Sequence, residues 1–155
     1  MSAALDFHGV EKAVKQLLLD PLTGDAVAMY TTTAHDKQRA IFPMGLVECL
    51  EMIPRGVYHP LTDANVNVVV MTSKTDVEYP SAPSSEPYAV GLEHSPRVNG
   101  VIEQAEGLTD AQIASAFAAH STLTCHKLEF RNIDQYDDND DVLLTNMMFA
   151  LILSA

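Results

Sequence analysis

The sequence predicts an α+β fold in which the whole chain, residues 1–155, forms a single domain. Three patterns predict this class: helical spacing of apolar residues near the N-terminus, strand-like valines near the middle, and two strand-like segments at the C-terminal end. A chain of this length buries roughly 70% of the surface of its unfolded form, so its core needs neither a disulfide nor a metal ion.

The first predicted element is a helix from Phe7 to Leu19. Asp6 is a suitable N-cap, and Pro21 ends the helical pattern. Glu11 and other polar residues lie outside the apolar stripe, on the side expected to face solvent. The stripe itself consists of residues spaced three and four apart: Val10, Ala13, Val14, Leu17 and Leu18.

Strands are expected in the next part of the chain. A short apolar piece, Ala26–Tyr30, leads into a polar loop, Thr31–Arg39. The segment Ala40–Ile53 is apolar on both alternations and predicts one kinked or paired strand, with a short helix over Leu46–Ile53 as the alternative. Val66–Thr72 is the clearest strand, and because both of its faces are apolar it belongs inside a sheet or under a helix.

A long Pro/Ser-rich arm, Ser73–Pro87, follows this strand. Pro80, Pro83 and Pro87 prevent a regular element there. Long loops in compact domains are commonly functional or become ordered against a partner, so an ordered arm and a disordered loop are both open interpretations.

Two short helices come next and are expected to pack together. The pair Ser95–Pro96 has the residue types of a cap and a first helical position, and Gly107 closes this helix. Thr109 and Gln112 form a capping-box pattern for the second helix, which runs to about Ala119. The predicted buried residues of the two helices are Val98, Val101, Ile102 and Ala105, then Ile113, Ala116 and Phe117.

The chain ends in a predicted C-terminal β-hairpin. It consists of a strand Leu123–Ile133, an acidic connection Asp134–Asp141 and a strand Val142–Leu153. His126 falls on the apolar face of the first strand, where we expect a hydrogen-bonded core histidine. The second strand is apolar almost throughout, which indicates a strand in the centre of a sheet or one covered by helices.

The charge balance excludes several classes of function. The chain has 9 Lys+Arg against 21 Asp+Glu, a formal net charge of −12. Tight nucleic-acid binding needs a stripe of basic residues that this sequence lacks, although an acidic surface would let DNA pass without adhering. Charged residues make up 19% of the chain against a typical ~25%, so part of the surface is expected to be covered by another copy of the chain.

The sequence also bears on location. Met1–Asp6 lacks the positive and apolar regions of a signal peptide, which predicts synthesis in a cytosol. The longest apolar run, Met147–Leu153, is too short for a membrane span of about 20 residues. Cys49 and Cys125 are the only cysteines and belong to no C-x-x-C unit, so a zinc cluster has no support.

No residue is assigned a catalytic, cofactor-binding or metal-binding role. The run Asp137–Asp141 contains the first half of a calcium loop, but Val142 and Met148 stand where such a loop needs glycine and glutamate, so a solvated turn is preferred. The run Glu93–Ser95 has the residue types of a hydrolase triad, yet neighbours in sequence point in different directions. The other histidines have no metal-ligand spacing, and the glycine-rich nucleotide motifs are absent.

The order of these elements resembles that of the tail terminator, or tail-completion, proteins of long-tailed bacteriophages. The residues that carry the resemblance are Phe7–Leu19, Ile41–Ile53, Val66–Thr72 and Leu123–Leu153. It implies an antiparallel sheet with helices packed on one face, assembled as a homo-hexameric ring in the virion neck. It further implies contacts with the tail tube protein and a head-completion or connector protein, and a channel through which DNA passes.

Other functions remain open. The arm is longer than this layout requires, which is compatible with a head-completion or decoration protein. The alternative from another class is a small cytosolic enzyme or ligand-binding domain with an unrecognised pocket, and His94, His126 or a pair of acids lining a pocket would favour it. The acidic connection Asp134–Asp141 is compatible with a channel wall, with the outer surface or with a cation site.

Overall fold

The computed structural model describes residues 5–18, 28–31, 44–73, 91–138 and 142–155. In chain order its elements are α1 (Phe7–Leu18), β1 (Ala28–Thr31), β2 (Met44–Pro54), β3 (Leu61–Ser73), α2 (Gly91–Glu106), α3 (Asp110–His120), β4 (Thr124–Asp138) and β5 (Val142–Ser154). The predicted α+β class is confirmed. The arm Ser73–Pro87, the polar loop Thr31–Arg39 and the tip of the C-terminal connection fall almost wholly outside the described residues.

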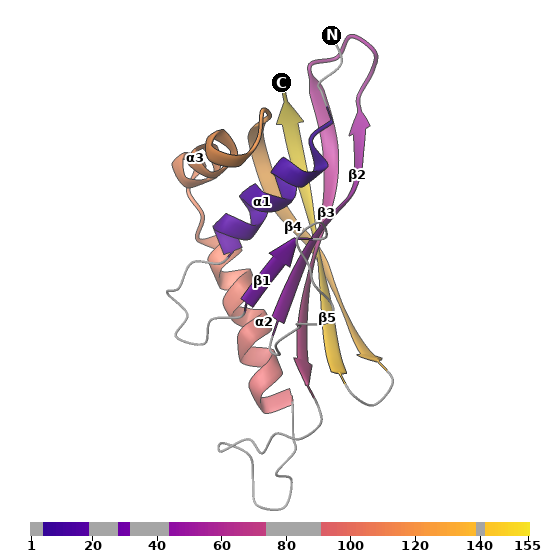
Figure 1. Cartoon of the computed structure of the whole chain (residues 1–155), viewed down its shortest axis with the longest axis vertical. Helices are drawn as coiled ribbons and strands as arrows, with labels where there is room; N and C mark the ends of the chain where they lie inside the picture. The colour runs from indigo at the N-terminus through magenta and orange to yellow at the C-terminus, as the bar shows by residue number, and fades with distance from the viewer. Residues whose placement is uncertain (1–4, 19–27, 32–43, 74–90, 139–141) are drawn as a thin grey trace, which may run out of the picture.

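The strands form one sheet in the order β1-β2-β3-β5-β4. Four of them pair antiparallel, and β1 adds a short parallel edge along the first residues of β2. The three described helices lie on one side of the sheet, as Figure 1 shows. The structure therefore confirms an antiparallel sheet with helices on one face, with β1 as the single parallel exception.

The N-terminal helix follows the predicted pattern closely. The whole apolar stripe of α1 is buried, and Asp6 accepts a hydrogen bond from the Gly9 N–H at 3.0 Å, as an N-cap does. The second oxygen of Asp6 accepts from the Ser121 hydroxyl at 2.9 Å, which ties the start of α1 to the end of α3. A Cβ at Gly9 would stand 2.7 Å from the His120 carbonyl oxygen, so only glycine allows α3 to approach α1 this closely.

The middle strands also follow the sequence. The segment around Leu46–Ile53 is a strand and the helical alternative is wrong, because antiparallel pairing to β3 uses its backbone groups. A bulge between Cys49 and Glu51 supplies the kink. Val66, Val68 and Val70 are fully buried under the helices, and β3 lies between β2 and β5, which confirms its predicted interior position.

The start of α2 was predicted wrongly. The helix begins at Gly91, so Pro96 lies inside it instead of at its first position. The extra turn is anchored on the sheet by His94, whose ring nitrogens lie 2.8 Å from the Thr72 hydroxyl and 2.7 Å from the Thr145 hydroxyl. These tertiary contacts outweigh the local preference of a Ser–Pro pair for a helix start.

The capping box of α3 is confirmed. The Thr109 hydroxyl accepts from the Gln112 N–H at 3.2 Å, and the Gln112 side chain accepts from the Thr109 N–H at 2.8 Å. The buried face consists of Ile113, Ala116 and Phe117, as predicted. The expected packing of α2 on α3 is wrong, because α3 packs on α1 instead.

We predict that Thr109→Ala lowers the free energy of unfolding by about 0.5–2 kcal/mol, because the Gln112 N–H loses its acceptor at an exposed helix start. Urea denaturation monitored by circular dichroism measures the change. Thr109→Ser keeps the hydroxyl and should retain most of the stability. Equal losses in the two variants would contradict a capping role.

The C-terminal hairpin is confirmed, with longer strands than predicted. Asp134, Asp137 and Asp138 belong to β4, since pairing with β5 continues as far as Asp138 opposite Val142. β5 is an interior strand between β3 and β4, and one of its faces is covered by helices. None of the helices that the structure describes is long and apolar enough to span a membrane.

Candidate functional site

The side of the sheet away from the helices carries a broad apolar surface, which we call the open face. Its side chains alternate with the buried ones along β2, β3 and β5 and line up across the strands by register. No helix among the described residues covers it (Figure 1). The apolar residues of the open face include Leu46, Ile53, Leu61, Val69, Met71, Leu144, Met148, Ala150 and Ile152. A sheet face that meets only water usually carries mostly polar side chains, so an apolar face with no described helix over it is unusual for a monomer.

Two amides at the centre of the open face have unpaired oxygens. The Oδ1 atoms of Asn67 and Asn146 are buried and have no hydrogen-bond partner, and the Asn67 side chain is only 9% exposed. The residues are neighbours across β3 and β5, because Asn67 pairs with Met148 and Val69 pairs with Asn146. A buried acceptor without a donor costs about 1–3 kcal/mol, so each of these two oxygens destabilises the sheet locally.

Charges lie at the two margins of this face. Glu48 and Glu51 stand on β2, where the outer edge is paired to β1 only as far as Val47 among the described residues. At the β4 margin, Glu129 lies 3.3 Å from the Lys127 ammonium and 3.5 Å from the Arg131 guanidinium. The β2 margin is therefore acidic, while the β4 margin is nearly balanced.

A second exposed apolar feature is the turn that joins β2 to β3. Val57 is 77% exposed and Tyr58 is 92% exposed, the highest values among large apolar residues in the described chain. The hairpin projects beyond α1 and α3 at one end of the molecule (Figure 1). The sequence analysis did not single out these residues, although an apolar pair between Gly56 and His59 was available as a signal, since turns usually contain polar residues or glycine.

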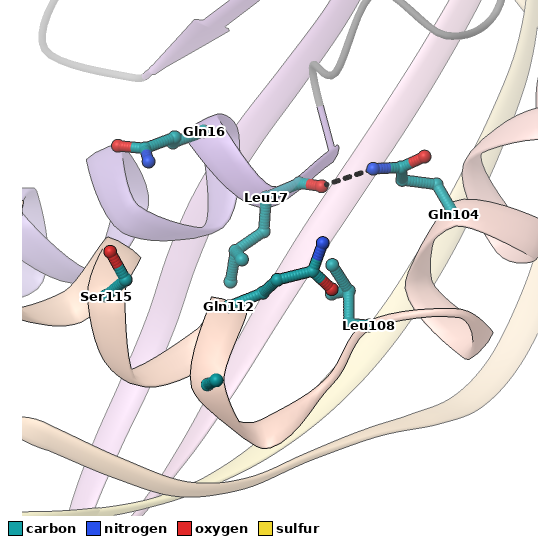
Figure 2. Close-up of a pocket in the computed structure, with 7 residues that line it drawn as sticks. Gln16, Leu17, Gln104, Leu108, Gln112 and Ser115 are labelled. Carbon is teal, nitrogen blue, oxygen red and sulfur yellow. Dashed lines mark hydrogen bonds between the residues drawn. The ribbon is translucent and has the colours of Figure 1, made fainter.

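A shallow groove of about 340 Å³ lies between α1, the end of α2 and α3. Figure 2 shows the Gln104 amide donating to the Leu17 carbonyl oxygen at 3.2 Å across its rim. The remaining lining is Gln16, Leu108, Ala111, Gln112 and Ser115, which includes no acid, histidine or cysteine. Ser115 carries a hydroxyl that could act as a nucleophile, but no titratable side chain of the lining stands beside it to activate it.

The residue types of a hydrolase triad are not assembled. His94 is 1% exposed, and both of its ring nitrogens are engaged by threonine hydroxyls. Burial, together with the nearby Arg97 guanidinium, lowers the pKa of His94 below its ordinary value. Ser95 is exposed on the helix surface, away from this network. His94 therefore fastens α2 to β3 and β5 instead of serving as a base.

The prediction that His126 is a core residue was wrong. It is exposed, and its Nε2 lies 2.7 Å from the Ser154 hydroxyl. A bulge between Cys125 and Lys127 shifts the alternation of β4, so Cys125 becomes the buried residue. The sequence pattern alone does not reveal such a shift.

Neither cysteine is set up as a nucleophile. Burial raises the pKa of Cys49 and of Cys125 to about 12, with the Glu11 carboxylate adding to the effect at Cys49. Glu11, which was expected at the surface, is 3% exposed and accepts a hydrogen bond from the Cys49 N–H at 2.9 Å. It satisfies the backbone at the bulge of β2, a structural role that the sequence analysis missed.

The acidic run does not form a recognisable cation site in the described residues. Its first members, Asp137 and Asp138, pair in β4 opposite Leu143 and Val142, and residues 139–141 lie outside the described chain. Within the ranges that the structure describes, no three potential ligands gather to hold a metal ion.

Comparison with known proteins does not supply a function. The chain matches no protein-family model, and no curated protein matches it significantly. Its function must therefore be argued from its own surface.

Proposed function

We propose that this chain is a structural subunit that assembles with copies of itself, as a ring-forming tail terminator or tail-completion protein at the head–tail junction of a long-tailed phage. The observation that carries the proposal is the open face, whose apolar side chains line up across β2, β3 and β5 with no described helix over them. A surface of this kind becomes stable when another protein covers it. The chain, which is poor in charge, has the composition of a subunit partly buried by neighbours.

The virion role adds two further expectations. A ring at the neck conducts DNA, and a subunit of net charge −12 gives such a ring a wall that does not retain phosphates. The tail tube and a head-completion protein would be its neighbours along the tail axis. A catalytic function has no comparable support in the groove between α1 and α3, whose lining carries no titratable side chain.

Sedimentation velocity tests this function directly. At micromolar concentration we expect a species much larger than the 16.9 kDa chain, with six copies as the expected number. Negative-stain electron microscopy of that species should show a ring with an axial opening wide enough for a duplex. A monomer at all concentrations up to about 100 µM, or a closed particle without an opening, would contradict the proposed function.

A further inference from the structure

The groove between α1, α2 and α3 gathers amide side chains from all three helices. Three of the five glutamines of the chain line it, namely Gln16, Gln104 and Gln112. No side chain of the lining is charged, although charged residues make up 19% of the chain. We call this cavity of about 340 Å³ the glutamine groove. Its neutral lining suits an uncharged ligand better than an ion, because an ion would lose hydration there without gaining an opposite charge.

The fold holds two of these amides by their oxygen ends. The Oε1 atom of Gln112 accepts from the Thr109 N–H at 2.8 Å in the capping box, and the Oε1 atom of Gln16 accepts from His120 Nε2. Both bonds leave the amide nitrogens available as donors, and Figure 2 shows these nitrogens turned toward the space between the helices. Because the two side chains are already held, they lose little conformational entropy when a ligand binds.

The glutamine groove offers donors but few acceptors. Gln104 uses its amide N–H to bond to the Leu17 carbonyl oxygen at 3.2 Å, and its own oxygen points away from the groove in Figure 2. The lining contains no carboxylate, and the Ser115 hydroxyl adds one more group that can donate. Leu108 and Ala111 supply apolar contact area between these polar groups. A matching ligand therefore carries carbonyl oxygens, few N–H groups and small apolar surfaces.

Proline-containing peptides have this combination of groups. A proline residue keeps its main-chain carbonyl and lacks the N–H, and its ring is a compact apolar surface. Segments rich in proline adopt the polyproline II helix, whose carbonyl oxygens are not used internally. This helix is already extended before it binds, so its ordering costs little free energy.

We propose that the glutamine groove binds an uncharged, proline-containing peptide segment of a partner protein, whose main-chain carbonyl oxygens accept from the Nε2 groups of Gln16 and Gln112. The proline rings pack on Leu108 and Ala111. The glutamine groove lies on the helical side of the sheet, away from the open face. Binding there goes beyond the proposed function and does not depend on self-assembly.

Charge and size limit which segments fit the glutamine groove. A charged side chain would find no partner in the lining, and the net charge of −12 repels anions in particular. The volume of about 340 Å³ is at the lower end of the ~300–1,000 Å³ range of small-ligand sites, so the bound segment is short. A short ligand with two or three hydrogen bonds should have a dissociation constant of about 0.1–1 mM.

The test titrates the full chain with the peptide acetyl-Ala-Pro-Ala-Pro-Ala-amide and follows binding by saturation-transfer NMR on the peptide signals, which works for a monomer and for a ring. Gln16→Glu and Gln112→Glu each replace the donor nitrogen with an oxygen and keep the oxygen that the fold uses, so the capping box stays intact. Each variant should weaken binding roughly tenfold. Asn132→Asp makes the same change at an exposed site on β4 and is the matched control that should bind like the wild type.

Two further probes identify the chemistry of the ligand. Acetyl-pentaalanine-amide has an N–H at every residue and should bind roughly threefold more weakly than the proline peptide, and acetate should show no saturation transfer. Equal binding of the two peptides would overturn the requirement for proline. Acetate that displaces the peptide would instead identify an anion site and overturn the inference. No saturable binding below about 10 mM, or equal binding by the wild type and both glutamate variants, would overturn the site itself.

Discussion

Replacing Phe149 with alanine should lower the free energy of unfolding by about 3–5 kcal/mol. Phe149 is fully buried in the interior strand β5, opposite Val66 on β3 and Phe130 on β4. Its ring meets the Phe130 ring edge-to-face, with centroids 5.6 Å apart. Truncation removes this contact and leaves a cavity at the place where the sheet, α1 and α3 share one core.

Thermal and urea denaturation measure this loss, which is a large share of the 5–15 kcal/mol that usually stabilises a domain. Phe7→Ala is the matched control, because the same side chain is removed from a site that is 38% exposed. We expect Phe7→Ala to lower the free energy of unfolding by less than about 1 kcal/mol. If both variants lost the same free energy, β5 would not be the interior strand that the structure shows.

Elements with a strong local period were predictable from sequence. The apolar stripe of α1, Val10 to Leu18, is buried as its spacing predicted. The same holds for the valines of β3 that begin at Val66. The capping box at Thr109 was also predictable, because it joins two side chains only three residues apart. In these elements the information that determines the structure lies within one or two turns of chain.

The errors arose where distant contacts decide the outcome. Glu11 reads as a surface residue, but its partner is a backbone N–H at the β2 bulge, 38 residues away. Likewise, α2 begins before Ser95 because His94 bonds to two threonines that are 22 and 51 residues away. His126 lies on the wrong face because a bulge adds one residue to the alternation of β4.

The candidate site could be predicted only in part. The sequence predicted that both faces of β5 are apolar. A strand of this kind is expected to be covered on both faces. The packing of α1, α2 and α3 decides which face of the sheet stays uncovered. A local sequence pattern does not predict how these helices pack. The unpaired oxygens of Asn67 and Asn146 are likewise a property of the assembled sheet.

We expect the folded protein to lose stability as the pH falls, because His94 becomes protonated. A neutral imidazole donates through one ring nitrogen and accepts through the other, so it bonds to both Thr72 and Thr145. Protonation turns both nitrogens into donors and places a buried cation near Arg97, which itself donates to the Thr72 hydroxyl at 3.3 Å. The hydrogen bond that a threonine had donated is lost, at a cost of about 1–3 kcal/mol.

The direction of the pH dependence follows from the lowered pKa of His94, whose causes are burial first and Arg97 second. Between this lowered pKa and the unfolded value of about 6.5, the unfolded chain binds more protons than the folded one. The stabilising contribution of His94 is therefore complete above pH 6.5 and decreases as the pH falls below it, until the folded pKa is passed.

Free energies of unfolding, measured from pH 8 down to pH 5 on the wild type and on His94→Gln, isolate this contribution from that of the many carboxylates. We expect the difference between the two proteins to shrink as the pH falls, because glutamine does not titrate and the wild type loses its advantage. His126→Gln removes an exposed histidine and serves as the control for loss of a titrating side chain. A difference that stayed constant from pH 8 to pH 5 would show that His94 tolerates protonation in place, and the threonine pair would then hold the imidazolium as well as the neutral ring.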